Sequence, residues 1–304
     1  MGQADWQAMG IPPDISRNGY LVGTAGFDLP DWVGRFYPPD STVRKRLDIY
    51  QAYFSFLEIS NYFSDPQRET YVQLAKNLRD STECSVRVPK RIACPKVWNE
   101  DIGKSMLLEV IQAVGPLVEC GRLYSLVFSL DEKTVRSQSR LDYVLATTSL
   151  AQKNRIDAHV EFWHKSWHTY GVLDVLKGNG IGIANIEIPV SHAFPLKGYA
   201  TSHKGYIRYC GRNRRGGVGS REGFDYRYTT SDIEEMVEAQ QALNKKVGTA
   251  AVVYGNVVGA QAIANGVQNI LLLNHAVEVD KMMKNPTRSG SRNKDYRAKG
   301  IRIN

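Results

Sequence analysis

Eight short apolar runs recur along the chain, and this repetition constrains the fold more than any other feature of the sequence. Short apolar runs bounded by turn residues are typical of buried parallel strands, and their separation leaves room for a helix between most of them. The sequence therefore predicts an α/β fold, a closed (β/α)8 TIM barrel, whose functional residues lie at the C-terminal ends of the strands. The runs are residues 20–24, 56–58, 84–88, 123–128, 159–162, 181–185, 206–209 and 250–254.

The length of the chain fits a single domain with extensions. A barrel of this type takes roughly 250 residues, and the chain has 304. We expect an N-terminal extension over 1–18, the barrel over 19–280 and a flexible tail over 281–304. The sixth β/α unit is predicted to be irregular, with a long loop in place of a full helix, because Pro189 and Pro195 interrupt the segment before the seventh run.

Capping and breaking residues predict where the helices begin and end. A side-chain cap or a proline in the first turn marks a start, and a glycine followed by proline marks a stop. The predicted starts are Ser41 or Thr42, Asp65–Pro66, Asn99 and a capping box of Ser231 with Glu234, and the predicted stop is Gly115–Pro116.

The cysteines and the apolar segments bear on the cellular compartment. None of the four cysteines forms a C-x-x-C pair, which excludes zinc-ribbon and thioredoxin-like motifs. Free thiols are typical of a reducing compartment. No apolar stretch approaches the ~18 residues of a membrane span, and the N-terminus does not resemble a signal peptide. We therefore expect a cytoplasmic protein with no membrane partner.

The positive charge of the chain is concentrated at its C-terminus. Residues 281–304 contain eight basic residues and one acidic residue, a charge of +7, so the total of +8 leaves only +1 for residues 1–280. The segment is rich in glycine, serine and asparagine, a composition typical of a disordered tail. Two interpretations remain open, a solubilising tail or an electrostatic arm that binds nucleic acid.

Charged side chains end several of the predicted strands. Glu58 and Glu161 end the second and fifth runs, and a partly desolvated carboxylate there suits a general base or acid. Pairs of carboxylates recur in glycoside hydrolases. A structural glutamate satisfied by backbone donors or an arginine is the alternative for each. Lys90, after the third run, is predicted at the rim as an anion ligand or a Schiff-base amine, or else as a solvated lysine.

The seventh run leads into the most specific candidate for anion binding. Arg208 ends this run and should point into the barrel mouth, where it needs a carboxylate or an anionic ligand. The glycine- and arginine-rich segment 211–221 follows, beginning with Gly211, Arg212 and Asn213. Loops after strands seven and eight often hold phosphate, because glycine exposes backbone N–H groups and arginine donates two hydrogen bonds. A merely solvated loop is the alternative.

Two further candidates lie near the predicted mouth. Tyr226 follows the arginine-rich segment and is expected to wall the pocket or to stack on a ring. His164 and His168 are four residues apart, and on one helix face they would provide two metal ligands. A third matching ligand is missing, so metal binding is not our leading interpretation.

Several of these motifs together resemble a known family. Their order and spacing resemble the YecE-like family, also called domain of unknown function 72, over about Leu21 to Leu273. This family is known as a TIM barrel and has no established activity, so the resemblance implies a fold and a map of the site. It adds Asn61 and Asn256 to the expected site residues. The motifs are residues 23–38, 57–63, 86–92, 160–167, 207–213 and 225–236.

Five residues depart from the pattern of the family at the expected site. These departures imply either a different substrate or a barrel without activity. They are Phe27, Ser129, Trp163, Glu187 and Cys210, where the family usually has Trp, Gln, Arg, Asp and His.

The leading hypothesis is a hydrolase-type enzyme that acts on a small anionic or phosphate-bearing substrate. Glu58 would be the general base, Lys90 would stabilise developing negative charge, and Glu161 or His164 would be the acid. No cofactor is expected. The substrate would be bound by Asn61, Arg208, Gly211, Arg212, Asn213, Tyr226 and Asn256.

Two alternatives remain open, a binding module and a metal-dependent hydrolase. In the first, a catalytically silent barrel binds nucleic acid through its arginine loop and the tail 281–304. In the second, a divalent metal is held by Glu58, Glu161, Glu187 and His164.

Overall fold

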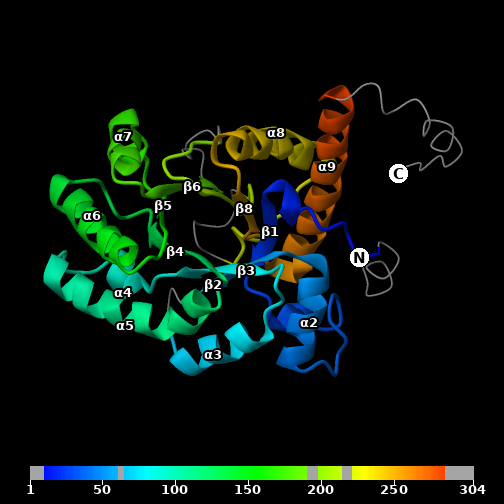
Figure 1. Ribbon diagram of the computed structural model, residues 1–304, viewed down its shortest axis with the longest axis horizontal. Coiled ribbons are helices and arrows are strands. Elements are labelled where there is room, and N and C mark those ends of the chain that lie inside the picture. The colour runs from blue at the N-terminus through cyan, green and yellow to red at the C-terminus, as the bar shows by residue number, and fades with distance from the viewer. Residues whose placement is uncertain (1–9, 61–64, 190–197, 214–220, 285–304) are drawn as a thin grey trace, which may run out of the picture.

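The computed structural model describes residues 10–60, 65–189, 198–213 and 221–284, with side chains up to 280. Its parallel strands form one closed barrel in sequence order (Figure 1), which confirms the predicted (β/α)8 fold. The strands are β1 (Tyr20–Ala25), β2 (Phe56–Ser60), β3 (Glu83–Arg87), β4 (Leu123–Leu130), β5 (Ala158–Phe162), β6 (Gly182–Glu187), β7 (Gly205–Tyr209) and β8 (Ala250–Tyr254).

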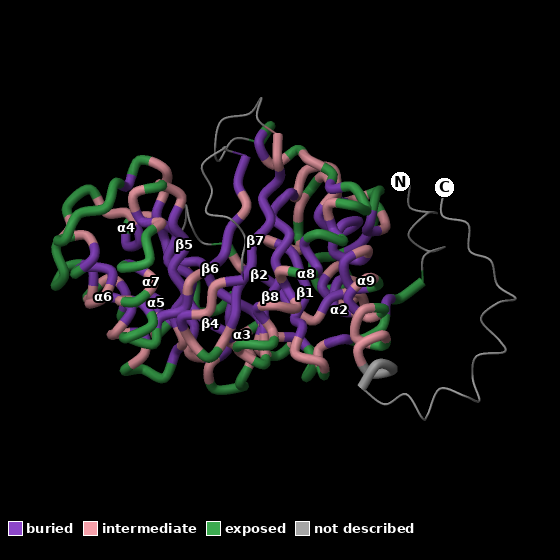
Figure 2. The backbone as a smooth tube through the Cα atoms, turned by 90° about the horizontal axis from the view of Figure 1, so that it is seen from above, coloured by how far each residue is buried: buried purple, intermediate pink, exposed green. Residues whose placement is uncertain are grey.

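Helices cover the outside of the barrel and bury its outer face. Neighbouring helices α3 and α5, α5 and α6, and α8 and α9 pack against each other. Figure 2 shows the strands as a buried centre within a more exposed periphery. The helices are α2 (Val43–Tyr53), α3 (Arg68–Asn77), α4 (Lys90–Ala93), α5 (Glu100–Glu119), α6 (Gln138–Lys153), α7 (Tyr170–Gly178), α8 (Thr230–Val247) and α9 (Gln261–Lys284).

The barrel closes where the first and last strands meet. Tyr20 of β1 pairs with Ala250 of β8, while Gly23 pairs with Phe56 of β2. The register is regular except between β3 and β4, where it shifts at Cys84/Ser85. β4 therefore contains one residue more than β3 across this shift, a β-bulge.

The sixth β/α unit contains no helix in the part of the chain that the structure describes. Residues 198–204 instead run back along β6. The Asn185 side chain exchanges hydrogen bonds with the backbone of Tyr199. The Thr201 hydroxyl donates to the carbonyl of Ile181 and accepts from the N–H of Ile183. Residues 190–197 lie outside the described residues.

Two helix boundaries differ from the sequence prediction. α3 begins at Arg68, after a Gln67 that makes no side-chain cap, and not at Asp65–Pro66. α5 continues through Pro116 to Glu119. A proline lacks the N–H that would bond the carbonyl four residues earlier, here that of Gln112. The guanidinium of Arg68 on α3 donates to this carbonyl at 2.6 Å, so the helix does not need to end.

Five of the α-helices have side-chain caps at their start, namely α2, α5, α6, α7 and α8. Thr42 and Asn99 cap α2 and α5, as predicted. The capping box of α8 consists of Thr229 and Asp232 and not of Ser231 and Glu234. α9 extends to Lys284, four residues beyond the expected end of the barrel. Within the described ranges, no helix combines the length and the apolar character of a membrane span.

The lower half of the barrel is filled by apolar and aromatic side chains. Tyr124 stacks on His159 with ring centroids 5.9 Å apart, and Tyr206 lies 5.3 Å from the same imidazole. Burial lowers the pKa of His159 to about 4, so its ring is neutral at neutral pH. The buried interior residues are Leu21, Phe56, Tyr124, Val127, Ala184, Ile186, Ile188, Tyr206, Cys210, Ala251 and Val253.

We expect Gly23→Ala to destabilise the barrel strongly. A Cβ atom at Gly23 would lie 1.9 Å from the carbonyl oxygen of Phe56, so β1 and β2 would have to move apart. The expected loss is about 3 kcal/mol in the free energy of unfolding, measured by urea denaturation. Gly171→Ala is the control, because nothing lies within 4 Å of that position on α7. Equal midpoints for the two variants would contradict the prediction.

Candidate functional site

Three of the predicted site residues meet inside the barrel. Glu58 on β2, Glu161 on β5 and Arg208 on β7 are all almost fully buried. The Nε of Arg208 lies 3.2 Å from Oε1 of Glu58, and its Nη1 lies 3.5 Å from Oε1 of Glu161. One guanidinium therefore bridges the two carboxylates that the sequence places at the ends of distant strands.

Arg87, at the end of β3, is a site residue that the sequence reasoning missed. Its Nη2 lies 3.6 Å from Oε1 of Glu161, and its Nε donates to the Ser129 hydroxyl at 3.2 Å. Arg87 lies within an apolar run, two residues after inward-facing Ser85, and this period of two could have revealed it. Glu58, Arg87, Glu161 and Arg208 form what we call the charged cluster, with two charges of each sign.

A hydrogen-bond chain connects the charged cluster to the aromatic interior below. The Tyr206 hydroxyl donates to Oε2 of Glu58 at 2.7 Å and lies 2.8 Å from the Ser85 hydroxyl. Burial raises the pKa of Tyr206 well above its usual value, and the nearby Glu58 carboxylate raises it further. Tyr206 thus remains a neutral donor. Both oxygens of Glu58 are engaged, one by Tyr206 and one by Arg208.

Glu161 carries a negative charge at neutral pH. Burial alone raises its pKa, but Arg208 and Arg87, with hydrogen bonds from Trp163 and Ser129, outweigh burial and lower the pKa below its usual range. The Trp163 indole N–H and both arginines converge on Oε1. The second oxygen, Oε2, is buried and accepts no hydrogen bond of standard geometry.

Cys210 is the other partner of Arg208. The Nη1 of Arg208 donates to the Cys210 sulfur at 3.1 Å. Burial raises the pKa of this thiol to about 12, so it stays protonated and acts as a neutral acceptor.

Lys90 and His164 lie apart from the charged cluster. The Lys90 ammonium forms an ion pair with Asp131 at 2.8 Å, and this hydrogen bond raises its pKa. A Schiff base forms only from a neutral amine, so the raised pKa of Lys90 argues against this predicted role. The Nδ1 of His164 accepts from the Ser166 N–H and caps the short turn Lys165–Trp167. His168 instead bonds the carbonyl of Phe162, so the two histidines do not form a metal pair.

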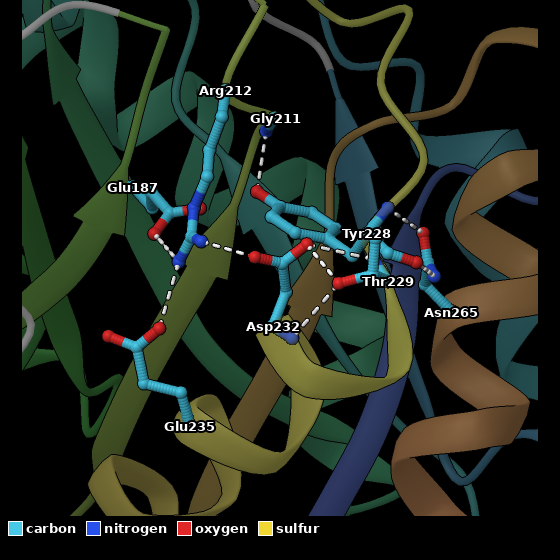
Figure 3. Close-up of polar contacts among 8 residues, drawn as sticks. All are labelled: Glu187, Gly211, Arg212, Tyr228, Thr229, Asp232, Glu235 and Asn265. Carbon is cyan, nitrogen blue, oxygen red and sulfur yellow. Dashed lines mark hydrogen bonds and ion pairs between the residues drawn. The ribbon is translucent and has the colours of Figure 1, made fainter.

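Arg212 is held by acidic side chains. Its guanidinium forms two hydrogen bonds with Glu187 on β6, at 3.0 and 2.9 Å, and one with Asp232 on α8 at 2.5 Å. Figure 3 shows it between these carboxylates, with Glu235 beside them and Asp232 completing the Thr229 capping box. The hydrogen bond to Glu187 is the main cause that raises the pKa of Arg212. The Asp232 carboxylate thus already caps the N-terminus of α8, where an anion would otherwise bind.

The described neighbours of Arg212 also have internal partners. The Gly211 N–H donates to the Tyr228 hydroxyl, and the Asn213 amide donates to the carbonyl of Glu222. The half-buried Tyr226 ring packs edge-on against Tyr228. Asn256 is fully buried and bonds the carbonyl of Tyr226 and the Asn265 side chain. These groups support the loop from within and do not present free donors to an anion.

Parts of the predicted site lie outside the described residues, namely Asn61, which follows β2, and residues 214–220 of the arginine-rich segment. Among the residues that are described, no group of three or more His, Cys, Asp or Glu side chains could hold a metal ion. Arg208 lies between Glu58 and Glu161, and Glu187 is paired with Arg212. This arrangement does not support the metal-site alternative.

A family model described as a protein of unknown function, DUF72, matches residues 21–289 of the sequence. The chain belongs to the DUF72 family. The expected resemblance is therefore confirmed. No curated protein matches the sequence.

Solved structures of DUF72 family proteins have the same fold. One from Thermotoga maritima is 24% identical with a TM-score of 0.73 and covers 85% of this chain and 99% of its own. One from Enterococcus faecalis is 19% identical with a TM-score of 0.72 and covers 84% of this chain and 95% of its own. At sequence identities below 25%, the similarity to these structures establishes the fold alone.

The positions that the resemblance marked as departures from the family pattern lie, with one exception, beside the charged side chains. Ser129 contacts Arg87, Trp163 contacts Glu161, and Cys210 contacts Arg208. Glu187 holds Arg212. Phe27 is the exception. Its ring lies next to Tyr50 on α2, with the two ring centroids 6.2 Å apart.

We expect Arg208→Met to destabilise the fold in a pH-dependent way. Removing the bridge leaves two buried carboxylates undercompensated, at a cost of about 3 kcal/mol at pH 7. Glu161 has a depressed pKa in the folded state, so its contribution to stability is present above its unfolded pKa of ~4.3 and is lost as the pH falls through its folded pKa. The difference between wild type and variant should therefore shrink below about pH 4.

Urea denaturation across this pH range measures the effect. Arg44→Met is the matched control, because Arg44 pairs with Asp48 on the surface, and such pairs contribute about 0.5 kcal/mol or less. A difference between wild type and Arg208→Met that does not change with pH would contradict the electrostatic account.

Proposed function

We propose that this DUF72 barrel is a hydrolase-type enzyme that acts on a small anionic, phosphate-bearing substrate at the C-terminal face. The observation that carries the proposal is the charged cluster, which buries ionised groups where TIM barrels place their chemistry. Buried ion pairs are weak contributors to stability compared with apolar packing. The pairing of both glutamates with Arg208 also fits the structural alternative, and we take the burial of four charges at this end of the barrel as support for a functional role.

Glu161 is the general base in this proposal. Its lowered pKa supports a charged carboxylate at neutral pH, and its Oε2 accepts no hydrogen bond of standard geometry. Glu58 was the base in the sequence-based hypothesis, but both of its oxygens are engaged by Arg208 and Tyr206. We therefore assign to Glu58 the positioning of Arg208, and to Glu161 the base and not the acid.

The two arginines supply the stabilisation of negative charge. The charged cluster is neutral while both carboxylates are ionised. When Glu161 accepts a proton from water, the cluster gains a net charge of +1 next to the reacting centre. Arg87 and Arg208 then face the charge that develops on the phosphoryl oxygens, the electrostatic stabilisation that dominates in many enzymes.

The proposed step is the hydrolysis of a phosphoester. Water loses a proton to Oε2 of Glu161 as its oxygen bonds to phosphorus. The bond from phosphorus to the ester oxygen breaks, and that oxygen leaves with the bonding electrons and is protonated from solvent. Lys90 and Arg212 take no part in this step, because each is paired with carboxylates at the rim.

Glu161→Gln should abolish turnover. Loss of a general base typically costs 10²–10⁴ in rate, so we expect at least a ~100-fold fall in kcat on the best substrate of a panel of p-nitrophenyl phosphate, bis-p-nitrophenyl phosphate and p-nitrophenyl glycosides. Glu58→Gln should cost less, about tenfold, since it only loosens Arg208.

Glu69→Gln, an exposed change on α3, is the control and should leave the rate unchanged. A kcat of Glu161→Gln within about tenfold of wild type on the best panel substrate would contradict the assignment of the base. Preferential hydrolysis of the glycosides would contradict the phosphoester class.

The acid limb of the pH profile offers a separate test. Because Arg208 and Arg87 hold the pKa of Glu161 below its usual range, the base stays ionised below the ordinary glutamate pKa of ~4.3. We expect kcat/KM to remain flat from neutral pH to about pH 5 and to fall only at more acidic values. A fall centred near pH 6 to 7 would point to a different base, such as a histidine.

Other expectations from the sequence stay predictions. Nucleic-acid binding through the tail 281–304 depends on residues that lie outside the described side chains. Cytoplasmic location rests on the cysteines, which are all free. The absence of a cofactor also stays a prediction.

A further inference from the structure

We infer that the indole ring of Trp163 is a stacking platform for a cyclic sugar, so that the substrate is a cyclic sugar phosphate. This inference rests on the proposed function, because it names the substrate class of the same site. It is carried by one aromatic ring that is hydrogen-bonded to the charged cluster.

The indole is fixed by its hydrogen bond to the proposed base. Trp163 follows the last residue of β5 and donates its indole N–H to Oε1 of Glu161. The polar edge of the ring therefore points into the barrel, toward a fully buried carboxylate. The rest of the ring is half-buried at the C-terminal end of the strand. The hydrogen bond to Glu161, the proposed general base, therefore fixes the orientation of the indole ring.

Trp163 differs from the other tryptophans that the structure describes. Trp167 stacks on Phe162 at 4.6 Å, and Trp32 and Trp98 each pack against a tyrosine ring. Those indoles belong to the packing between strands and helices. Within the described part of the chain, no aromatic ring packs on the face of Trp163, although an indole face is a strong partner for flat apolar surfaces.

A second aromatic side chain borders the same apolar surface. Phe224, in the segment between β7 and α8, is half-buried and packs, as Trp163 does, against the buried residues inside the barrel. That buried group includes Ile188 and Cys210, at the ends of β6 and β7. Trp163 thus contacts this apolar group as well as, through its indole N–H, the charged cluster.

This combination matches the chemistry of a sugar ring. A pyranose has an apolar face of C–H groups that packs on an indole, and hydroxyl groups at its edge that donate hydrogen bonds. The phosphate would meet Arg87 and Arg208, and Oε2 of Glu161 would remain the acceptor for the attacking water. An open-chain phosphate would meet the arginines but would leave the indole face uncovered.

Calorimetric titration with two probes tests the inference. Glucose 6-phosphate carries a ring and glycerol 3-phosphate does not, while both present a phosphate monoester. We expect wild type to bind glucose 6-phosphate about tenfold more tightly, the scale of one good aromatic contact. Trp163→Ala and Trp163→Leu should remove this preference, whereas Trp163→Phe, which equally lacks the hydrogen bond to Glu161, should retain most of it.

Trp98→Ala is the matched control, because it removes another half-buried indole, one that packs on Tyr143. It should not alter the preference. Equal affinity of wild type for the two probes, binding of neither probe, or an equal loss of both in the Trp163 variants would overturn the inference. Binding needs no turnover, so a ring preference that depends on Trp163 would stand even if Glu161→Gln showed the proposed hydrolysis to be wrong.

Discussion

The bridge that Arg208 forms between Glu58 and Glu161 is the interaction on which the upper half of the barrel depends. Each carboxylate is fully buried, and neither could remain charged there without a guanidinium beside it. Arg87 adds a second positive charge on the side of Glu161. The four groups come from β2, β3, β5 and β7, so their mutual compensation also ties together strands that are not neighbours.

The charged cluster and the aromatic interior divide the barrel into two levels. Below, Tyr124, Tyr206 and His159 fill the space with rings and a neutral imidazole. Above, carboxylates and guanidiniums alternate. Tyr206 belongs to both levels, since its ring packs below while its hydroxyl reaches Glu58. A rigid lower level fixes the height and direction of the ions above it, which a site with preorganised charge requires.

Much of the fold and part of the site follow from local patterns. Alternation along each strand places Glu58, Glu161 and Arg208 on the inner face, so the sequence could bring them together. It could not show how Arg212 divides its charge between Glu187 and Asp232, because those partners are 25 and 20 residues away. For the same reason the sequence could not show that α5 continues through Pro116. The carbonyl of Gln112, which Pro116 leaves without its helical donor, accepts from Arg68 on another helix.

The register shift between β3 and β4 decides which side chains of β4 meet the ions. Before the shift Tyr124 faces inward, and after it Val127 and Ser129 do, while Phe128 packs outward among the helices. Strict alternation from Tyr124 would instead turn Phe128 toward Arg87 and Glu161 and place the serine outside. Pairing of the full-length β4 with β3 without this bulge would therefore exchange a hydroxyl for a benzyl group beside the charges. The one extra residue of β4 is thus what keeps the hydroxyl of Ser129, and not the ring of Phe128, next to Arg87.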